Sequence, residues 1–398
     1  MKRSICLMLL FILLASIGIT SFAATDKNNE AEIYNIKPAE FSVDAKSAVL
    51  MEANTGKILF SQNENEPAAP ASVTKIMTLL LVMEAIEDGR INTDDTVTIS
   101  QNAASMGGSQ VFLKEGEEMS VRDLIKCTVI ASANDAAVAL SELVAGDEKN
   151  FVNMMNSKAA ELGMKNTNFE NTTGLDDTAK KHVSSALDIA IMSQELLKHT
   201  LILEYSSLWQ DTIRNGEFTL TNTNRLVRYY DGCNGLKTGS TDKAGYCISA
   251  TAKRNGMQLI AVVMGAETRD ERNAIARSLL DYGFANYELY SFEEKKLDAI
   301  SLHRGKNNSV SAYSKPFVAL IEKGYKSKVQ IIYEIPDYLV APMKSEDVVG
   351  KIRFKINDKL LGETSIYVKD DIERITLLEI YVRMMKNSIS STKNKNDE

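Results

Sequence analysis

The sequence has 398 residues, of which 44% are hydrophobic and 25% are charged, and its formal net charge at pH 7 is −7. This length and composition predict two or three globular domains with sizeable cores. The negative charge disfavours nucleic acid or an anionic surface as a general partner, and the sparse histidines and cysteines show no metal-binding spacing, so we expect neither a metal nor a cofactor.

Residues 1–23 have the pattern of a secretory signal. A positively charged start precedes an almost wholly apolar run at 5–19. The segment ends at Ala23 with the small residues that a cleavage site requires. We therefore expect cleavage before Ala24 and an exported mature chain. The alternative is an uncleaved membrane anchor, for which the apolar run is short.

The mature chain begins with a polar stretch at 24–40 that we expect to be loose, and residues 47–63 then predict a β-hairpin. A loop ending at Pro70 leads into a helix from Ser72 that is apolar nearly all round, which predicts a position at the centre of its domain. Other helices are expected at 121–131, 136–144, 148–162, 185–198 and 271–282. Other strands are expected at 96–100, 246–252 and 259–264. Strands at both ends of this region therefore flank a helical middle.

The pattern of the sequence changes near residue 290. Short strand-like segments and polar turns run to residue 368 without a helical pattern or a catalytic grouping, which predicts a small all-β domain. Residues 370–390 then carry apolar side chains at helical spacing and predict an amphipathic helix, followed by a charged tail.

Ser72 and Lys75 form the first of three short motifs. They are three residues apart at the start of the apolar helix, so their side chains project to the same side. A serine hydroxyl is a weak nucleophile that needs a base within hydrogen-bond reach. A lysine can be that base only if burial or a nearby cation lowers its pKa. Alone, this spacing is a weak indication of catalysis.

Two further motifs, Ser132-Ala133-Asn134 and Lys237-Thr238-Gly239, follow in the same chain. The three motifs in this order are typical of penicillin-binding proteins and class A β-lactamases. The chain resembles the low-molecular-mass penicillin-binding proteins, which are serine-type D-alanyl-D-alanine carboxypeptidases, over roughly residues 36–368. Other matching stretches are 70–78, 108–113, 134–136, 162–164, 173–175 and 244–247. The one departure is Ala133, where many members carry glycine, and both side chains are small.

The resemblance implies a fold of α/β plus all-β class. Residues 36–288 would form a β-lactamase-like D,D-peptidase domain, with an antiparallel sheet and a helical subdomain. Residues 290–368 would form a small β-sandwich domain. The amphipathic helix at 370–390 would then bind a membrane surface, as is common in this family.

The resemblance also implies catalytic roles for three residues. Ser72 would attack the carbonyl carbon between two D-alanines, and Lys75 would take the serine proton. Ser132 would relay that proton to the leaving amine. The acyl-enzyme on Ser72 would then be hydrolysed. A positioned base contributes about 10²–10⁴-fold to such a reaction.

The same resemblance implies binding roles for five residues. Asn134 would hydrogen-bond the amide backbone of the substrate and the amine of Lys75. Lys237 and Thr238 would hold the terminal carboxylate, and Gly239 would leave room for the substrate along the strand edge. The backbone N–H groups of Ser72 and Ser240 would form the oxyanion hole.

The partners implied by the resemblance are a peptidoglycan stem peptide that ends in D-Ala-D-Ala, β-lactam antibiotics and the membrane surface. The protein would act at the outer face of the bacterial cell membrane as an exported, peripheral enzyme. Nucleic acid is not among the expected partners.

Three other functions compete with this one. A class A β-lactamase needs a glutamate that activates the deacylating water, and no glutamate between the second and third motifs lies in the Glu-x-x-Leu-Asn setting of those enzymes. A catalytically idle peptidoglycan-binding or penicillin-sensing protein would not need all the motif residues intact. A D,D-endopeptidase that acts on cross-links is the nearest alternative, and the sequence barely discriminates it from a carboxypeptidase.

Some reactive residue types lie outside the motifs. Cys127, Cys233 and Cys247 remain after signal cleavage, and we interpret them as buried or spare thiols. His182 lies in a polar run behind two lysines, and we interpret it as a solvated loop residue rather than a catalytic base.

Overall fold

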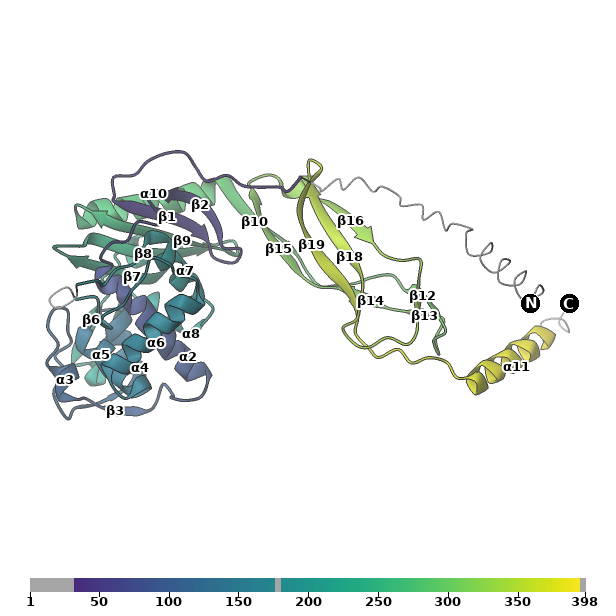
Figure 1. Cartoon of the computed structure of the whole chain (residues 1–398), viewed down its shortest axis with the longest axis horizontal. Helices are drawn as coiled ribbons and strands as arrows, with labels where there is room; N and C mark the ends of the chain where they lie inside the picture. The colour runs from purple at the N-terminus through teal and green to yellow at the C-terminus, as the bar shows by residue number, and fades with distance from the viewer. Residues whose placement is uncertain (1–31, 176–179, 394–398) are drawn as a thin grey trace, which may run out of the picture.

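The computed structural model describes residues 32–175 and 180–393. Figure 1 shows a larger body of helices and sheet, an elongated β body beside it, and a helix at the far end of the β body. The segment predicted to be a secretory signal, residues 1–23, lies outside the described residues.

A five-stranded antiparallel sheet forms the centre of the larger body, with the strand order β2-β1-β9-β8-β7. The bounds are Ser47–Glu52 for β1, Lys57–Gln62 for β2, Cys233–Thr241 for β7, Gly245–Arg254 for β8 and Met257–Ala266 for β9. The predicted hairpins are confirmed, and β1 pairs with β9 so that Ala48 lies opposite Val263. Strands from both sequence ends therefore meet in one sheet, as predicted, and β7 is left at its edge.

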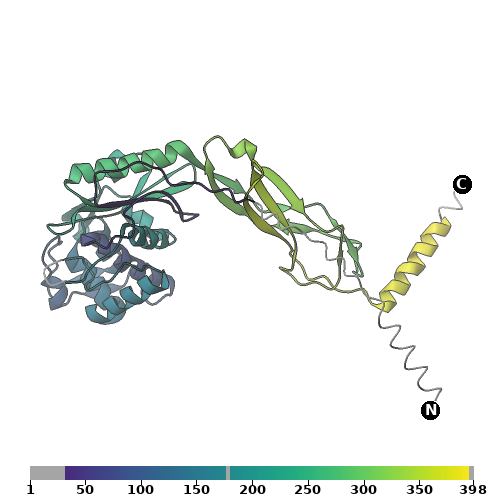
Figure 2. The ribbon, with the colours of Figure 1, turned by 45° about the horizontal axis from the view of Figure 1, so that its top comes forward.

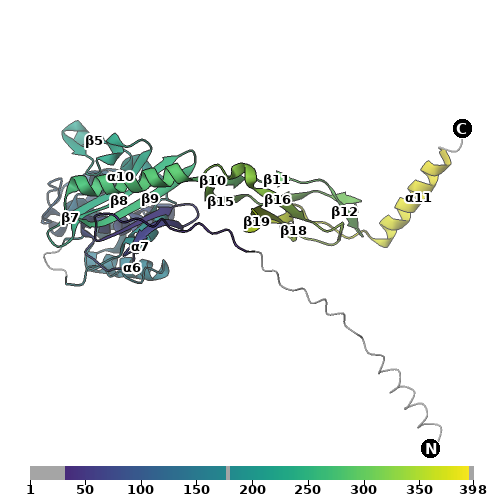
Figure 3. The same cartoon turned by 90° about the horizontal axis from the view of Figure 1, so that it is seen from above.

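The sheet lies between a single helix and a group of helices. Helix α10 (Arg269–Asn286) runs along one face (Figure 3), and α2 (Lys75–Glu87) and α7 (Ala186–Leu196) lie on the other. Side chains alternate across a strand, so Leu259 and Val263 pack in the cluster under α10. Ile260 packs on the opposite face with α2 and α7. As predicted, α2 is buried almost all round.

The segment before α2 differs from the expected helix. Residues Ala71–Thr74 form a 3₁₀ turn, η1, and the α-helix itself begins at Lys75. The other helices of this body are α3 (Gln101–Ala104), α4 (Val121–Val129), α5 (Asn134–Ala145), α6 (Glu148–Glu161), α8 (Leu201–Ser206) and α9 (Leu226–Tyr229). Its short hairpins are β3 (Thr96–Thr98) with β4 (Glu118–Ser120), and β5 (Gln210–Ile213) with β6 (Phe218–Thr221), with the 3₁₀ turn η2 (Arg214–Gly216) between the last two.

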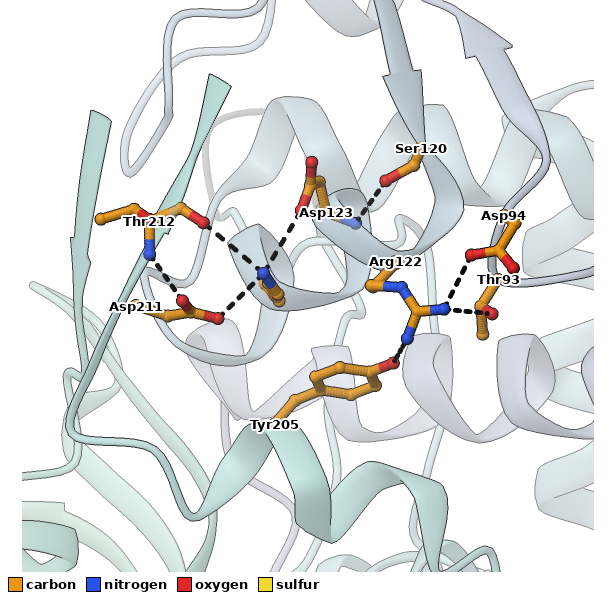
Figure 4. A network of polar contacts seen from close by, with 9 residues as sticks. Thr93, Asp94, Ser120, Arg122, Asp123, Tyr205, Asp211 and Thr212 are labelled. Carbon is orange, nitrogen blue, oxygen red and sulfur yellow. Dashed lines mark hydrogen bonds and ion pairs between the residues drawn. The ribbon is translucent and has the colours of Figure 1, made fainter. Parts of the chain in front are cut away.

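Polar contacts tie α4 to its neighbours. The ammonium group of Lys126 lies 2.9 Å from the carboxylate of Asp211 on β5 and 3.4 Å from that of Asp123. Figure 4 shows this group together with Arg122, whose guanidinium donates to the Tyr205 hydroxyl of α8 and to the Asp94 carboxylate. These contacts fix the helical region in which the second motif lies.

The elongated body is built from strands, as predicted. Its largest sheet has the order β11-β14-β19-β18-β16, a second has the order β13-β12-β17, and β10 pairs with β15. The bounds are Tyr287–Phe292 for β10, Lys295–Lys296 for β11, Ile300–His303 for β12, Ser309–Val310 for β13, Ala312–Ser314 for β14, Phe317–Glu322 for β15, Gln330–Glu334 for β16, Tyr338–Val340 for β17, Val348–Ile356 for β18 and Lys359–Val368 for β19. A 3₁₀ turn, η3 (Lys326–Lys328), precedes β16. The core contains Phe354, which stacks on Phe317 at a ring-centroid distance of 4.2 Å.

The chain before β1 joins the two bodies instead of being loose. The Tyr34 N–H donates to Leu360 O on β19, and the Leu360 N–H donates back to Glu32 O. A few residues later, the Ala39 N–H donates to Leu59 O on β2. The expectation of a loose segment was therefore wrong in part, because backbone groups of Glu32, Tyr34 and Ala39 are paired with the two bodies.

Helix α11 (Leu377–Lys393) follows the β body and projects from its far end (Figure 2). It begins later than the expected residue 370, because Ile372 exchanges backbone hydrogen bonds with Met343 and the Ile375 N–H donates to Arg304 O. Within residues 32–175 and 180–393, every helix is too short or too polar to cross a bilayer.

Candidate active site

The first motif is set by the turn between η1 and α2. Ser72 lies in the 3₁₀ turn and Lys75 is the first residue of the α-helix, which brings the Lys75 Nζ to 3.0 Å from the Ser72 Oγ. Lys75 is fully buried because α2 passes through the centre of the body. The predicted pairing of the two side chains is present in the structure.

Two further oxygens contact the buried amine. The Lys75 Nζ lies 2.6 Å from the Asn134 Oδ1 and 2.8 Å from the backbone oxygen of Thr173. Burial lowers the pKa of Lys75 well below its usual value, the positive charge of Lys237 lowers it further, and the Asp135 carboxylate opposes both effects. The amine is therefore held where its neutral form is favoured and where three polar partners are in reach.

The second motif lies at the start of α5. Asn134 opens the helix, and its side-chain Nδ2 donates to Gly107 O at 2.6 Å. Ser132, just before the helix, has φ +64°, a left-handed conformation that a serine seldom adopts. Such strain is characteristic of functional sites.

The third motif lies on the edge strand β7, which passes beside η1. A Cβ on Gly239 would lie 2.7 Å from the Ser72 backbone nitrogen and 2.9 Å from that of Val73. Glycine is thus required because the strand approaches the η1 turn, a reason that the sequence did not supply. Lys237 is buried, and its Nζ donates to Thr238 O at 2.9 Å.

A cavity of about 170 Å³ joins the three motifs. It is lined by Ser72, Ser109, Ser132, Thr223, Thr238, Gly239, Ser240, Arg269 and Arg272. Five of the eight predicted site residues line this cavity, and the other three are buried: Lys75, Asn134 and Lys237.

Sequence reasoning missed the two arginines, which come from the first turn of α10. Arg272 is only 3% exposed, and its guanidinium contacts the Asn273 Oδ1 and the Cys247 carbonyl oxygen. Burial and the charge of Arg269 lower the pKa of Arg272 to about 10. Burial and Arg272 in turn lower the pKa of Lys237 to about 7.

None of these three cations forms an ion pair within the described part of the chain: Lys237, Arg269 and Arg272. A buried charge without a counter-ion is costly, so this end of the cavity is suited to an anionic group of a ligand. The signal that could have revealed it is two arginines three residues apart at the start of a helix that packs on the sheet.

The loop that supplies Thr173 packs directly on the η1 turn. A Cβ on Gly174, where φ is +83°, would lie 1.9 Å from the Ala71 backbone oxygen. The Glu148 carboxylate accepts from the N–H and the hydroxyl of Thr172 and so holds the loop from the side of α6.

The interpretation of His182 as a solvated residue was wrong. His182 is buried, its Nε2 lies 2.7 Å from the Thr74 Oγ1 of the η1 turn, and its Nδ1 accepts from the Glu170 N–H. Its burial follows from the pairing of Val183 with Asn168, which folds the polar run back onto the body.

Cys127, Cys233 and Cys247 are free and buried, in agreement with their interpretation as buried or spare thiols. Burial raises the pKa of the Cys233 thiol to about 11, so this group stays protonated at neutral pH. Burial also raises the pKa of Cys127.

Comparisons with known proteins give one consistent result. The family model described as D-alanyl-D-alanine carboxypeptidase matches residues 34–268, and the model described as penicillin-binding protein 5, C-terminal domain, matches residues 284–374. The D-alanyl-D-alanine carboxypeptidase DacF of Bacillus subtilis is 41% identical over 97% of this chain and 98% of its own length. Penicillin-binding protein 5 of Haemophilus influenzae has a solved structure with 33% identity and a TM-score of 0.73, over 85% of this chain and all of that one. A D-alanyl-D-alanine endopeptidase of Pseudomonas aeruginosa is 32% identical over 58% of this chain and 74% of its own length.

The buried lysine of β7 gives a prediction about stability. Because the pKa of Lys237 is about 7 in the folded state and near 10.5 when unfolded, its burial opposes folding fully below pH 7 and ceases to do so above pH 10.5. We expect Lys237→Met to raise the free energy of unfolding at pH 6 by about 2–4 kcal/mol. The gain should shrink steadily as the pH rises to 9.5.

Denaturant unfolding at several pH values measures this effect, with the exposed Lys253→Met on β8 as the control. Two outcomes would contradict the lowered pKa of Lys237. In one, the Lys237→Met variant is no more stable than the wild type at pH 6. In the other, its free energy of unfolding increases equally at pH 6 and pH 9.5.

Proposed function

The chain belongs to the D-alanyl-D-alanine carboxypeptidase family of penicillin-binding proteins, and we propose that Ser72 is its nucleophile and Lys75 the base that activates it. The protein is thus a serine-type D-alanyl-D-alanine carboxypeptidase that acts on peptidoglycan in cell wall metabolism, outside the cytoplasm, and that binds β-lactams. The observation that supports the residue assignment is the environment of the Lys75 amine.

A neutral amine has two hydrogens and one lone pair. The Asn134 Oδ1 and the Thr173 carbonyl oxygen accept hydrogen bonds, so they take the two hydrogens of the Lys75 amine. The lone pair is then directed at the Ser72 hydroxyl, 3.0 Å away, and can accept its proton. The three contacts of Lys75 thus match what a base at this position requires.

The reaction then proceeds in two steps. The Ser72 Oγ forms a bond to the carbonyl carbon as its proton passes to Lys75. The C–N bond breaks, and the proton reaches the leaving amine by way of Ser132, which releases D-alanine. Water then attacks the acyl-enzyme, and hydrolysis of the ester frees Ser72.

The substrate is held at both sides of the scissile bond. The cations Lys237 and Arg272, with the Thr238 hydroxyl, bind the terminal carboxylate. The backbone N–H groups of Ser72 and Ser240 stabilise the oxyanion. The second hydrogen of the Asn134 Nδ2 is available for the amide backbone of the substrate, because one hydrogen binds Gly107 O.

The cavity also bears on the competing activity of a β-lactamase. Its lining residues within the described chain include no carboxylate, so no glutamate is placed to activate a deacylating water there. We therefore expect acylation by penicillin to be followed by slow release.

We further propose that residues 36–288 and 290–368 are separate domains. Separate hydrophobic clusters support this division, since the cluster around Phe354 is distinct from those on the two faces of the central sheet. The proposed boundary at residue 289 lies within β10 (Tyr287–Phe292), just after α10 ends at Asn286.

The expected mature protein is exported and peripheral at the outer face of the membrane, and α11 is the part that we propose binds the lipid. Four of its side chains are between 63% and 86% exposed and recur at helical spacing: Leu377, Leu378, Tyr381 and Met384. Arg383 donates to backbone oxygens of Gly305 and Lys306 and so orients the helix on the β body.

Replacing the nucleophile tests the central assignment. We expect Ser72→Ala to abolish covalent labelling by fluorescent penicillin and to lower the release of D-alanine from a pentapeptide by more than about 10⁴-fold. The exposed Ser207→Ala at the end of α8 is the matched control. A penicillin adduct on the Ser72→Ala variant would show that another residue is the nucleophile.

Removal of α11 tests the membrane proposal. A mature chain that ends at Thr376 keeps the Ile372 pairing with Met343, so the β body stays intact. We expect this variant to lose binding to anionic lipid vesicles while its carboxypeptidase activity is unchanged. A full-length mature protein that fails to bind such vesicles would show that α11 is not an anchor.

A further inference from the structure

A second cavity, of about 410 Å³, lies next to the carboxylate end of the active site. It is formed between α9, with the residue that precedes it, and the first turns of α10. Its polar lining includes Arg225, Tyr229, Asp270, Asn273 and Arg277. No step of the proposed reaction uses these residues.

The linings of the two cavities are in direct contact. Arg272 lines the active-site cavity, and its guanidinium contacts the Asn273 Oδ1, which lines the second cavity. On the opposite wall, Thr223 lines the first cavity and Arg225 the second. The charge of Arg225 contributes to the low pKa of Arg272, which also indicates that they are close.

The positive charge around this pair of cavities exceeds what one substrate carboxylate requires. Arg225 and Arg277 line the second cavity, and Arg269 and Arg272 line the first. None of these four arginines is in an ion pair within the described chain. Asp270 is the only carboxylate among the lining residues, so the second cavity keeps a net positive charge. It is therefore suited to a second anionic group.

The orientation of the bound peptide determines which of its residues lies next to the second cavity. The carboxylate held by Lys237 and Arg272 belongs to the residue that leaves, so the side chain of that residue is what can extend past the anchor. The methyl group of D-alanine is too short to do so. A longer side chain, or a peptide attached to it, has the second cavity as the adjoining space.

We propose that the cavity lined by Arg225, Tyr229 and Arg277 is a leaving-group subsite for a C-terminal D-residue whose side chain carries a further carboxylate, as in the peptide released from a cross-link. This inference rests on the proposed function, because it uses the same nucleophile and the same carboxylate anchor. The chemistry is unchanged: the Ser72 Oγ–C bond forms, the C–N bond breaks, the amine takes the proton, and water completes hydrolysis.

The test uses four synthetic peptides that end in D-Ala-D-Xaa and differ only in the leaving residue. D-alanine is the reference, and D-norleucine, D-α-aminoadipate and D-lysine have side chains of similar length with neutral, negative and positive ends. We expect the wild-type enzyme to cleave the aminoadipate peptide with a kcat/KM above that of the norleucine peptide, and the lysine peptide with the lowest value.

The double variant Arg225→Ala/Arg277→Ala should lower the aminoadipate-to-norleucine ratio of kcat/KM by about fivefold or more, the scale of partly exposed charge pairs. Its kcat/KM on D-Ala-D-Ala should change less than about twofold. Arg228→Ala is the matched control, because Arg228 is on α9 and stacks on Trp209 and Tyr229 without lining the cavity.

Two results would contradict the proposed subsite. One is a wild-type enzyme that shows no preference for the negatively charged side chain. The other is an aminoadipate-to-norleucine ratio of kcat/KM that falls equally in Arg228→Ala, which would indicate a general effect of positive charge near the site. Failure of the proposed function looks different, since the wild-type enzyme would then cleave none of the four peptides and would not be labelled by penicillin.

Discussion

The arrangement of this enzyme depends on keeping one lysine amine buried. Lys75 is surrounded by α2, the start of α5 and the Thr173 loop, and it contacts an amide oxygen, a carbonyl oxygen and the serine hydroxyl. A second buried cation, Lys237, lies on the adjoining strand and disfavours a charge on Lys75. These surroundings destabilise the fold at neutral pH, and the same effect favours the neutral amine that the proposed base requires.

Close backbone packing makes this burial possible. Gly239 allows β7 to approach the N–H groups of Ser72 and Val73, and Gly174 allows the Thr173 loop to lie against Ala71. His182 and Glu148 then hold that loop from behind. The Ser72–Lys75 pair, Asn134 and Lys237 thus come from three distant parts of the sequence and are fixed by contacts that involve glycine or backbone atoms.

This dependence on backbone contacts explains what the sequence could and could not predict. The Ser72–Lys75 pair, the hairpins and the all-β body follow local periodicity and spacing, and the structure agrees with them. The contact of the Thr173 backbone carbonyl with Lys75 could not be predicted from the sequence, because every residue type has a backbone carbonyl. The burial of His182 and the later start of α11 arise from strand-like pairings between distant residues, which local polarity does not reveal.

The pH dependence of the maximal acylation rate at saturating penicillin tests the neutral-lysine account most directly. Saturation removes the effect of Lys237 on the binding of penicillin, so the rising limb reports the Lys75 amine. A Lys75 amine with a lowered pKa predicts an inflection well below pH 10.5 and a level rate at higher pH. A rate that rises about tenfold per pH unit as far as pH 10 would show that Lys75 titrates as an ordinary lysine, and it would contradict the account.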